Sequence, residues 1–191
     1  MKKLLIFLFI TIAPLQAENI FPLDPAITYG KLDNGLTYYI RENSTPKDKV
    51  SMRLFIKSGS LMEEDHQRGL AHLLEHMAYN GSKNFPKKKI DEYLGSIGLN
   101  LGSHYNAYTG YFETVYDFEI PTERQQDVET AIQILADISQ NLSLEPEAFE
   151  KERKIVEEEW RRKFGSDEEY FDQLKTYIYD QSSIAERDPI G

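Results

Sequence analysis

Two of the four histidines in the chain stand in the pattern His72-Leu73-Leu74-Glu75-His76. On a helix, residues four apart share a face, about 40° from each other around the axis, and Glu75 lies beside them. Two imidazoles at this spacing can bind one metal ion, and an adjacent carboxylate can take a proton from a metal-activated water molecule. A plainer interpretation is two half-buried histidines on an amphipathic helix with a solvated glutamate.

A third ligand must come from His, Asp or Glu, because the chain has no cysteine and zinc enzymes usually supply three protein ligands. The candidates are the acidic residues between positions 150 and 159, although such a run is ordinarily a solvated helix face. In helical projection Glu159 lies about 20° from Glu152. Both fall in the apolar stripe formed by Phe149, Ile155, Val156 and Trp160. Since buried carboxylates need a metal or a positive partner, these two glutamates are singled out.

The two segments together resemble the pitrilysin/insulinase family of zinc metallopeptidases. The first is Gly69 to Pro86, GLAHLLEHMAYNGSKNFP, and the second is Glu152 to Trp160, ERKIVEEEW. The pattern H-x-x-E-H is the inverzincin signature, in which the order of the commoner zincin motif is reversed. The resemblance covers about Tyr29 to Gly191.

Site roles follow from this resemblance. It implies that His72, His76 and Glu159 bind one zinc ion per chain. It also implies that Glu75 is the general base and that Glu152 is a carboxylate that supports the metal ligands without binding the metal itself. The implied activity is that of a zinc-dependent endopeptidase acting on peptides or small proteins. Zinc would polarise the scissile carbonyl and acidify a water molecule, whose proton the base takes and then passes to the leaving amine.

A strand-like segment, Asn106-Ala107-Tyr108-Thr109, resembles the family segment on which the substrate backbone is laid as an added strand. The resemblance therefore implies that Asn106 and Ala107 bind substrate. Without it, this segment would be interpreted as an ordinary edge strand. His104 matches no metal position of the family and is expected to be a surface or core histidine, and His66, in an acidic loop, is expected to be exposed.

Hydrophobic periodicity predicts the elements that position these residues. Strands are expected at 36–41, 50–57 and 112–120, with a strand-type segment at 104–111. Helices are expected at 67–79, 86–97, 122–138 and 146–163, and Ile132 is placed in the apolar stripe of the third. The predicted fold class is α+β, with a mainly antiparallel sheet packed against helices. By resemblance it is the incomplete first half of a clamshell metallopeptidase.

Composition excludes several classes of protein. The 191 residues include 22 Lys and Arg against 32 Asp and Glu, a formal net charge of -10, so there is no basic field for nucleic acid. The absence of cysteine excludes a disulfide framework, a thiolate zinc finger, a cysteine nucleophile and a lipidated cysteine.

The N-terminus has the pattern of a secretory signal peptide. Lys2 and Lys3 precede an apolar run over 4–13, and Ala17 precedes Glu18. The run is shorter than the ~20 residues of a membrane-spanning helix. The predicted organisation is a signal peptide at 1–17, a lead-in segment at 18–28 and a peptidase N-terminal domain at 29–191. The mature protein is then expected in the bacterial periplasm or secreted, with no membrane association after cleavage.

Completeness is the remaining question. Family members have a second half that closes over the zinc site, and this chain stops before even the first half is complete. The expected partners are therefore a peptide substrate and a C-terminal half or partner chain. Two alternatives stay open: a non-catalytic metal-binding or assembly module, and an inactive truncated remnant. Zinc itself is inferred from ligand type and family, since such sites also accept other divalent ions.

Overall fold

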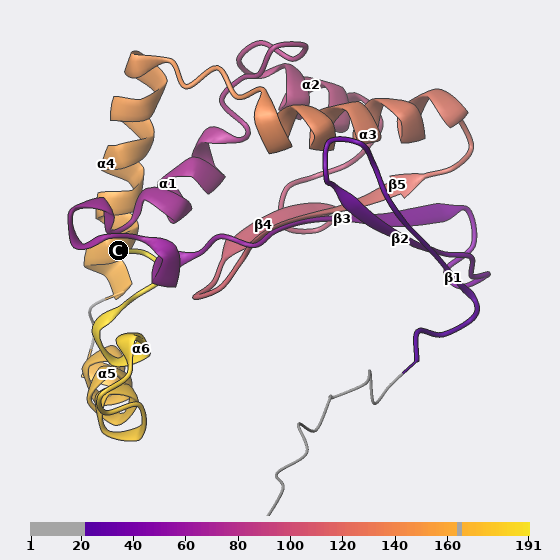
Figure 1. Ribbon diagram of the computed structural model, residues 1–191. Coiled ribbons are helices and arrows are strands. Elements are labelled where there is room, and N and C mark those ends of the chain that lie inside the picture. The colour runs from indigo at the N-terminus through magenta and orange to yellow at the C-terminus, as the bar shows by residue number, and fades with distance from the viewer. Residues whose placement is uncertain (1–21, 164–165) are drawn as a thin grey trace, which may run out of the picture. The chain divides into compact units, whose positions relative to one another are not determined.

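The computed structural model describes residues 22–163 and 166–191, so the expected signal peptide at 1–17 lies outside the described residues (Figure 1). Two compact units are distinguished, Met1–Lys47 and Asp48–Gly191. In the part of the chain that the structure describes, no helix combines the length and apolar character needed to cross a membrane.

The elements follow one another in a mixed order. The first unit holds β1 (Ile27–Lys31) and β2 (Thr37–Arg41). The second unit holds two 3-10 turns, η1 (Ser60–Met62) and η2 (Asp65–Gln67), with the strands β3 (Lys49–Ile56), β4 (Tyr105–Thr109) and β5 (Thr114–Pro121). Its helices are α1 (Leu70–Met77), α2 (Lys89–Ser96), α3 (Gln125–Gln140), α4 (Pro146–Lys163), α5 (Ser166–Ile178) and α6 (Ser183–Glu186).

The first unit is an antiparallel hairpin in which Tyr29 pairs with Tyr39. Its turn is made by Asn34, whose Oδ1 accepts the backbone N–H of Leu36 at 3.1 Å, and by Gly35 at a φ of 91°. Asn-Gly is the turn signal visible in the sequence. Strand β1 was not expected. Its five residues do not alternate regularly between buried and exposed positions, and most of them are exposed.

The second unit contains a three-stranded sheet of order β3-β5-β4, antiparallel throughout. The expected strand at 112–120 begins two residues later, at Thr114, and Phe112 lies exposed in the turn. The cause is a tight connection, in which the N–H of Gly110 donates to the carbonyl of Glu113 at 2.7 Å. The observed mixture of helices and antiparallel sheet confirms the predicted fold class.

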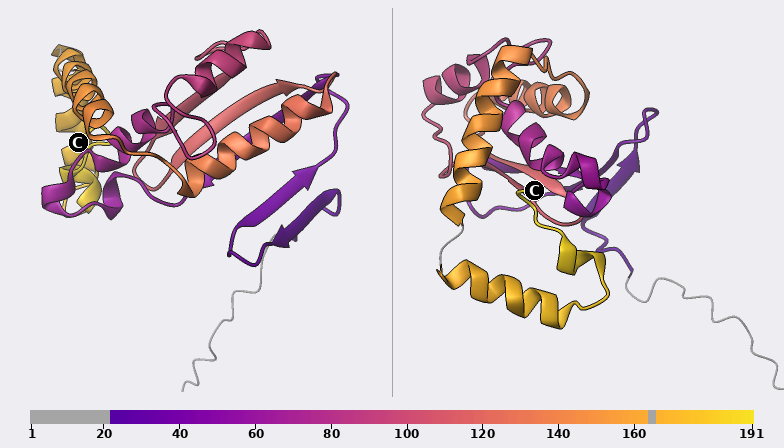
Figure 2. Two further views of the ribbon diagram at one scale, coloured as in Figure 1. Left: turned by 90° about the horizontal axis from the view of Figure 1, so that it is seen from above. Right: turned by 90° about the vertical axis from the view of Figure 1, so that its left-hand side faces the viewer.

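One face of this sheet packs on helices and forms the core, as Figure 2 shows for α3. The buried cluster joins α2, α3 and the strands: Ala78, Ile90, Leu94, Leu99, Tyr105, Tyr116, Phe118, Ile120, Ala131, Ile134 and Ile138. The prediction for Ile132 was wrong, since its side chain is 56% exposed. Residues at spacings of three and four from Ala131 share a face, so Ile134 and Ile138 turn inward and Ile132 turns to solvent.

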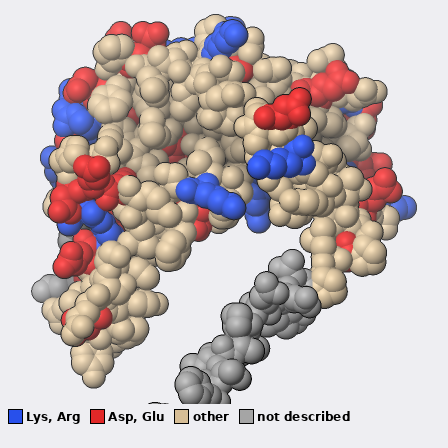
Figure 3. Space-filling model, in the orientation of Figure 1, with Lys and Arg blue, Asp and Glu red and all other residues tan. Residues whose placement is uncertain are grey.

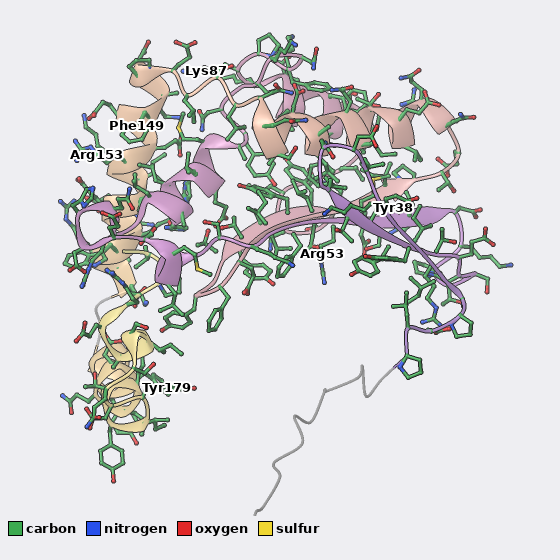
Figure 4. The ribbon with its side chains drawn as sticks, viewed as in Figure 1. Tyr38, Arg53, Lys87, Phe149, Arg153 and Tyr179 are labelled. Atoms are coloured by element: carbon green, nitrogen blue, oxygen red, sulfur yellow. The ribbon has the colours of Figure 1, made fainter. Side chains whose placement is uncertain are left out.

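The opposite face of the sheet is mostly polar along β3 and β5, apart from the exposed Phe55 on β3. Arg53 projects from it, away from α3 (Figure 4), and pairs with Asp117 on the neighbouring strand. Lys49 pairs with Glu119 at 3.4 Å in the same way. Cross-strand pairs of opposite charge stabilise a sheet modestly. Positive and negative side chains also lie close together elsewhere on the visible surface (Figure 3).

Helices α1 and α4 pack against each other (Figure 1). Helix α1 begins at Leu70 and not at residue 67. The reason is that Gly69 adopts a φ of 86°, which separates the 3-10 turn η2 from the helix. A Cβ at Gly69 would lie 3.0 Å from the carbonyl oxygen of Ile190. The C-terminal residues therefore contact the start of α1 directly.

Candidate metal centre

The two helices bring the predicted ligands together. Helix α1 carries His72 and His76 on one face, and α4 presents Glu159 to them. Oε2 of Glu159 lies 3.5 Å from Nε2 of His76 and 3.8 Å from Nε2 of His72. One ligand atom from each of the three residues lies within 4.8 Å of the others. Among the described residues, this is the set of His, Asp and Glu side chains arranged to hold a metal ion.

The donor set fits zinc. Tetrahedral zinc with bonds of about 2.0–2.1 Å to nitrogen and oxygen requires its ligand atoms about 3.4 Å apart. The two separations from Glu159, 3.5 and 3.8 Å, are close to that value, and all three ligand atoms lie within 4.8 Å of one another. Two imidazoles and one carboxylate also leave the fourth position of a tetrahedral ion open, which is the arrangement of catalytic zinc.

Glu152 contacts the outer nitrogen of His76. Its Oε2 lies 3.3 Å from Nδ1 of His76, and its side chain is almost fully buried. An imidazole bound to metal through Nε2 donates its Nδ1 proton to such a carboxylate, which fixes the ring and raises its basicity. Lys151 lies 3.7 Å from the same carboxylate and partly balances its charge. The burial of Glu152 is thereby compensated.

His72 is held differently. Its ring meets that of His76 edge-on at 4.8 Å between centroids, and within the described residues its buried Nδ1 atom has no hydrogen-bond partner. Burial lowers the pKa of His72, and the neighbouring His76 lowers it further. The ring is therefore neutral at pH 7, with a lone pair available for a metal.

Glu75 lies beside the three ligands and outside their set. Its Oε2 accepts a hydrogen bond of 2.6 Å from the hydroxyl of Thr109, the last residue of β4. Burial raises the pKa of Glu75, and the hydrogen bond from Thr109 opposes that rise. A cavity of about 310 Å³ opens next to it, lined by His72, Glu75, Ala107, Tyr108, Thr109, Glu159, Lys163, Asp188, Pro189 and Ile190.

The predicted substrate segment lies at the rim of this cavity. Ala107 lines it, whereas Asn106 is exposed and lines a separate groove on the polar face of the sheet. The two side chains point to opposite faces because strand residues alternate. Strand β4 pairs with β5 along one edge, and on the other edge the described residues offer only a bridge from Leu101 to Tyr105.

Three contacts at the site were not predicted. Glu63 accepts the N–H groups of Gly69 and Ala71, at 3.0 and 2.8 Å, and so caps the helix that carries the histidines. Thr109 contacts Glu75, as described above. Asp188 closes one wall of the cavity and pairs with Lys163 at 2.5 Å. Each acts across a long stretch of sequence or from an irregular segment, so no local pattern indicated it.

The remaining expectations have mixed outcomes. His66 is exposed, as predicted. His104 lies outside the ligand set, and its Nδ1 accepts the N–H of Asn100 at 3.3 Å. On α4, Phe149 projects beside Arg153 (Figure 4) and is partly buried, but Ile155 and Trp160 are exposed. The expected apolar stripe is thus narrower, because α1 covers only the face that carries Glu152 and Val156.

Comparison with known proteins gives a consistent result. The family model described as Insulinase (Peptidase family M16) matches residues 38–185. The probable zinc protease PqqL of Haemophilus influenzae is 38% identical over 190 residues, which is 98% of this chain and 20% of the relative. The chain therefore spans about a fifth of the length of that relative.

Solved structures agree with this. The periplasmic protease PqqL from Escherichia coli superposes with a TM-score of 0.85 at 37% identity, over 90% of this chain and 19% of that one. The structure of the first half of the same protease gives a TM-score of 0.86 at 37% identity. The match covers 90% of this chain and 36% of that one. The match lies within the first half of the larger protein.

Proposed function

The chain belongs to the insulinase family, peptidase family M16, and we propose that it forms the zinc-binding catalytic part of an endopeptidase acting on peptides or small proteins. One observation carries the proposal. Two imidazole nitrogens and one carboxylate oxygen converge within 4.8 Å, beside a partly buried glutamate at the edge of a cavity. Helices α1 and α4, which supply these groups, are the elements that the family motifs occupy.

In this proposal the metal is held by Nε2 of His72, Nε2 of His76 and a carboxylate oxygen of Glu159. Zinc, when bound there, supplies a Lewis acid that polarises the peptide carbonyl and lowers the pKa of water. Glu152 keeps the His76 ring oriented by accepting a hydrogen bond from its Nδ1–H group. The neutral state of His72, which follows from its lowered pKa, allows it to bind metal without first losing a proton.

Glu75 moves the proton. Its carboxylate takes a proton from the attacking water molecule and transfers it to the nitrogen of the leaving amine. A carboxylate with a raised pKa is suited to both steps, since general catalysis is most efficient when the pKa lies nearer the working pH. The position of Glu75 on the cavity wall supports this role, because both the water and the peptide have to reach it.

The substrate is proposed to lie along β4. An extended peptide would add as a strand to the edge of β4 near Ala107, using backbone hydrogen bonds that do not depend on its sequence. In this arrangement Ala107 faces the cavity. Asn106, whose side chain is exposed on the opposite face, would contribute through its backbone.

Hydrolysis is tested with the Glu75→Gln variant. The wild-type zinc-loaded chain is expected to cleave unstructured peptides, and Glu75→Gln to retain its zinc while losing at least about 100-fold in kcat, the usual scale for removing a general base. Glu158→Gln, an exposed glutamate on α4 that pairs with Arg161, is the matched control and should keep full activity. Undiminished hydrolysis by Glu75→Gln would show that another group moves the proton.

A second candidate is a metal-binding module that needs further polypeptide for activity. It is favoured by the extent of the match, which covers 20% of the relative and lies in the first half of the related protease. In that module, a C-terminal half or partner chain would complete the substrate site. A chain that binds zinc but hydrolyses peptides only after that polypeptide is added would support this module, and turnover by the chain alone would exclude it.

Export to the periplasm is also proposed. It is supported by the signal-like residues 1–17 and by the periplasmic location of the related protease from Escherichia coli. The mature protein isolated from cells is then expected to begin at Glu18, which intact mass measures directly. A mature chain that still begins at Met1 would contradict export by this route.

A further inference from the structure

A single hydrogen bond ties the proposed general base to the sheet. The hydroxyl of Thr109 donates to Oε2 of Glu75 at 2.6 Å, which is short for an O–H···O contact and typical of one to a charged oxygen. Glu75 belongs to α1 and Thr109 ends β4, so the bond crosses between the helix of the metal ligands and the strand at the cavity rim. Among the described residues, no other hydrogen bond reaches this carboxylate.

Thr109 is itself held firmly. It pairs with Thr114 at the end of the hairpin, and the next residue, Gly110, bonds to the carbonyl of Glu113. The carbonyl of Gly110 also accepts the N–H of Ser60 at 3.1 Å. These contacts fix the backbone on which the Thr109 hydroxyl is mounted.

Glu75 needs such a constraint. A glutamate side chain has three rotatable bonds and loses rotamer entropy when it is fixed. A general base must lie within hydrogen-bonding distance of the proton it takes. A misplacement of about 1 Å at a reacting group can cost 100-fold in rate.

We propose that Thr109 is a positioning residue for the hydrolytic reaction, whose hydroxyl holds Oε2 of Glu75 and leaves Oε1 free to take the proton. This inference rests on the proposed function, since it assigns a role relative to Glu75 as base. In this role the hydroxyl of Thr109 acts through the carboxylate of Glu75.

The kinetic test compares three variants of the full zinc-loaded chain. Thr109→Val keeps the shape of the side chain and removes the hydroxyl, whereas Thr109→Ser keeps the hydroxyl. Thr114→Val is the matched control. Thr114 pairs with Thr109 on the neighbouring strand, and its hydroxyl donates to the carbonyl of Ser58 at 2.9 Å, away from Glu75.

Thr109→Val is expected to lower kcat about 10- to 100-fold with KM changed less than about twofold. Thr109→Ser should restore kcat to within about threefold of wild type, and Thr114→Val should stay within the same range. A merely structural role would instead give equal losses in both valine variants or no rescue by serine. Either result, or an unchanged kcat in Thr109→Val, overturns the proposal.

A second readout does not depend on turnover. In crystal structures of the zinc-bound chain, the Glu75 carboxylate should occupy one position in wild type and Thr109→Ser, and should move or divide between conformers in Thr109→Val. The same single position in Thr109→Val would overturn the proposal even for an inactive chain. Absence of peptide hydrolysis by wild type, by contrast, counts against the proposed function and leaves this crystallographic comparison decisive for Thr109.

Discussion

Nδ1 of His76 lies 3.3 Å from Oε2 of Glu152, a residue that is only 7% exposed. The contact explains why a charged side chain is buried on the inner face of α4. A carboxylate in this position holds the imidazole with Nε2 directed at the metal. It also links the two helices independently of the metal.

Replacing this carboxylate should weaken the site. We expect Glu152→Gln to lower zinc affinity by about 10- to 100-fold, the range measured for groups that orient metal-binding histidines. The affinity is measured by competition with a chromogenic chelator. Glu158→Gln, exposed on the same helix, is the control and should leave the affinity unchanged. Equal affinities of wild type and Glu152→Gln would show that the His76 ring is oriented by other contacts.

The cap of α1 is expected to contribute to stability. Glu63 accepts two N–H groups at the first turn of this helix, and a negative charge there is also favoured by the helix dipole. Glu63→Ala should therefore lower the free energy of unfolding by about 0.5–2 kcal/mol, measured by urea denaturation. Glu63→Gln keeps one oxygen acceptor without the charge and should lose less. No difference between Glu63→Ala and wild type would mean that the α1 terminus is satisfied in another way.

Asp137 is expected to be the most sensitive buried carboxylate of the described residues. It is fully buried on α3, and its oxygens accept from the hydroxyl of Ser82 at 2.7 Å and from the backbone N–H and side-chain amide of Asn84 at 2.8 Å each. These bonds fasten the loop after α1 to α3. Asp137→Asn turns an amide toward existing donors and should cost about 1–3 kcal/mol of unfolding free energy at pH 7.

The pH dependence of that cost follows from the pKa of Asp137. Burial raises it, but the hydrogen bonds from Ser82 and Asn84 outweigh burial, so that the pKa lies below its usual value. A carboxyl whose pKa is lower in the folded state stabilises the fold above the unfolded value of about 3.9 and loses this contribution as the pH falls through the folded value. The difference between wild type and Asp137→Asn should thus be constant near neutrality and shrink below about pH 4.

Urea denaturation of both proteins over this pH range measures the effect. Asp180→Asn, at an exposed position, serves as the control and should track wild type throughout. A difference in unfolding free energy that grows on acidification would contradict this prediction and place the pKa of Asp137 above its usual value.

Much of the site was accessible from the sequence because it lies on regular helices. Spacing alone put His72 and His76 on one face of α1, and the projection of α4 put Glu152 and Glu159 on one side of the helix. The structure places all four side chains in contact across the two helices. Their roles as ligands and support remain predictions that metal binding has to test.

Other features depend on contacts that periodicity does not encode. Thr109 meets Glu75 from a strand 34 residues away, and Asp188 meets Lys163 through an irregular segment near the end of the chain. Ile155 and Trp160 were wrongly expected to be buried. A helical projection gives the direction in which a side chain points, but it does not give the width of the surface that packs against the helix. Helix α1 is short, so it covers only part of α4.

Zinc content measured on the purified chain tests the central claim most directly. We predict one tightly bound zinc ion per chain by elemental analysis, with the affinity lost in Glu159→Gln and kept in Glu158→Gln. Both variants should retain a cooperative thermal transition, which separates loss of a ligand from loss of the fold. A folded wild-type chain that binds no zinc, or a Glu159→Gln variant that binds it as tightly as wild type, would contradict the account.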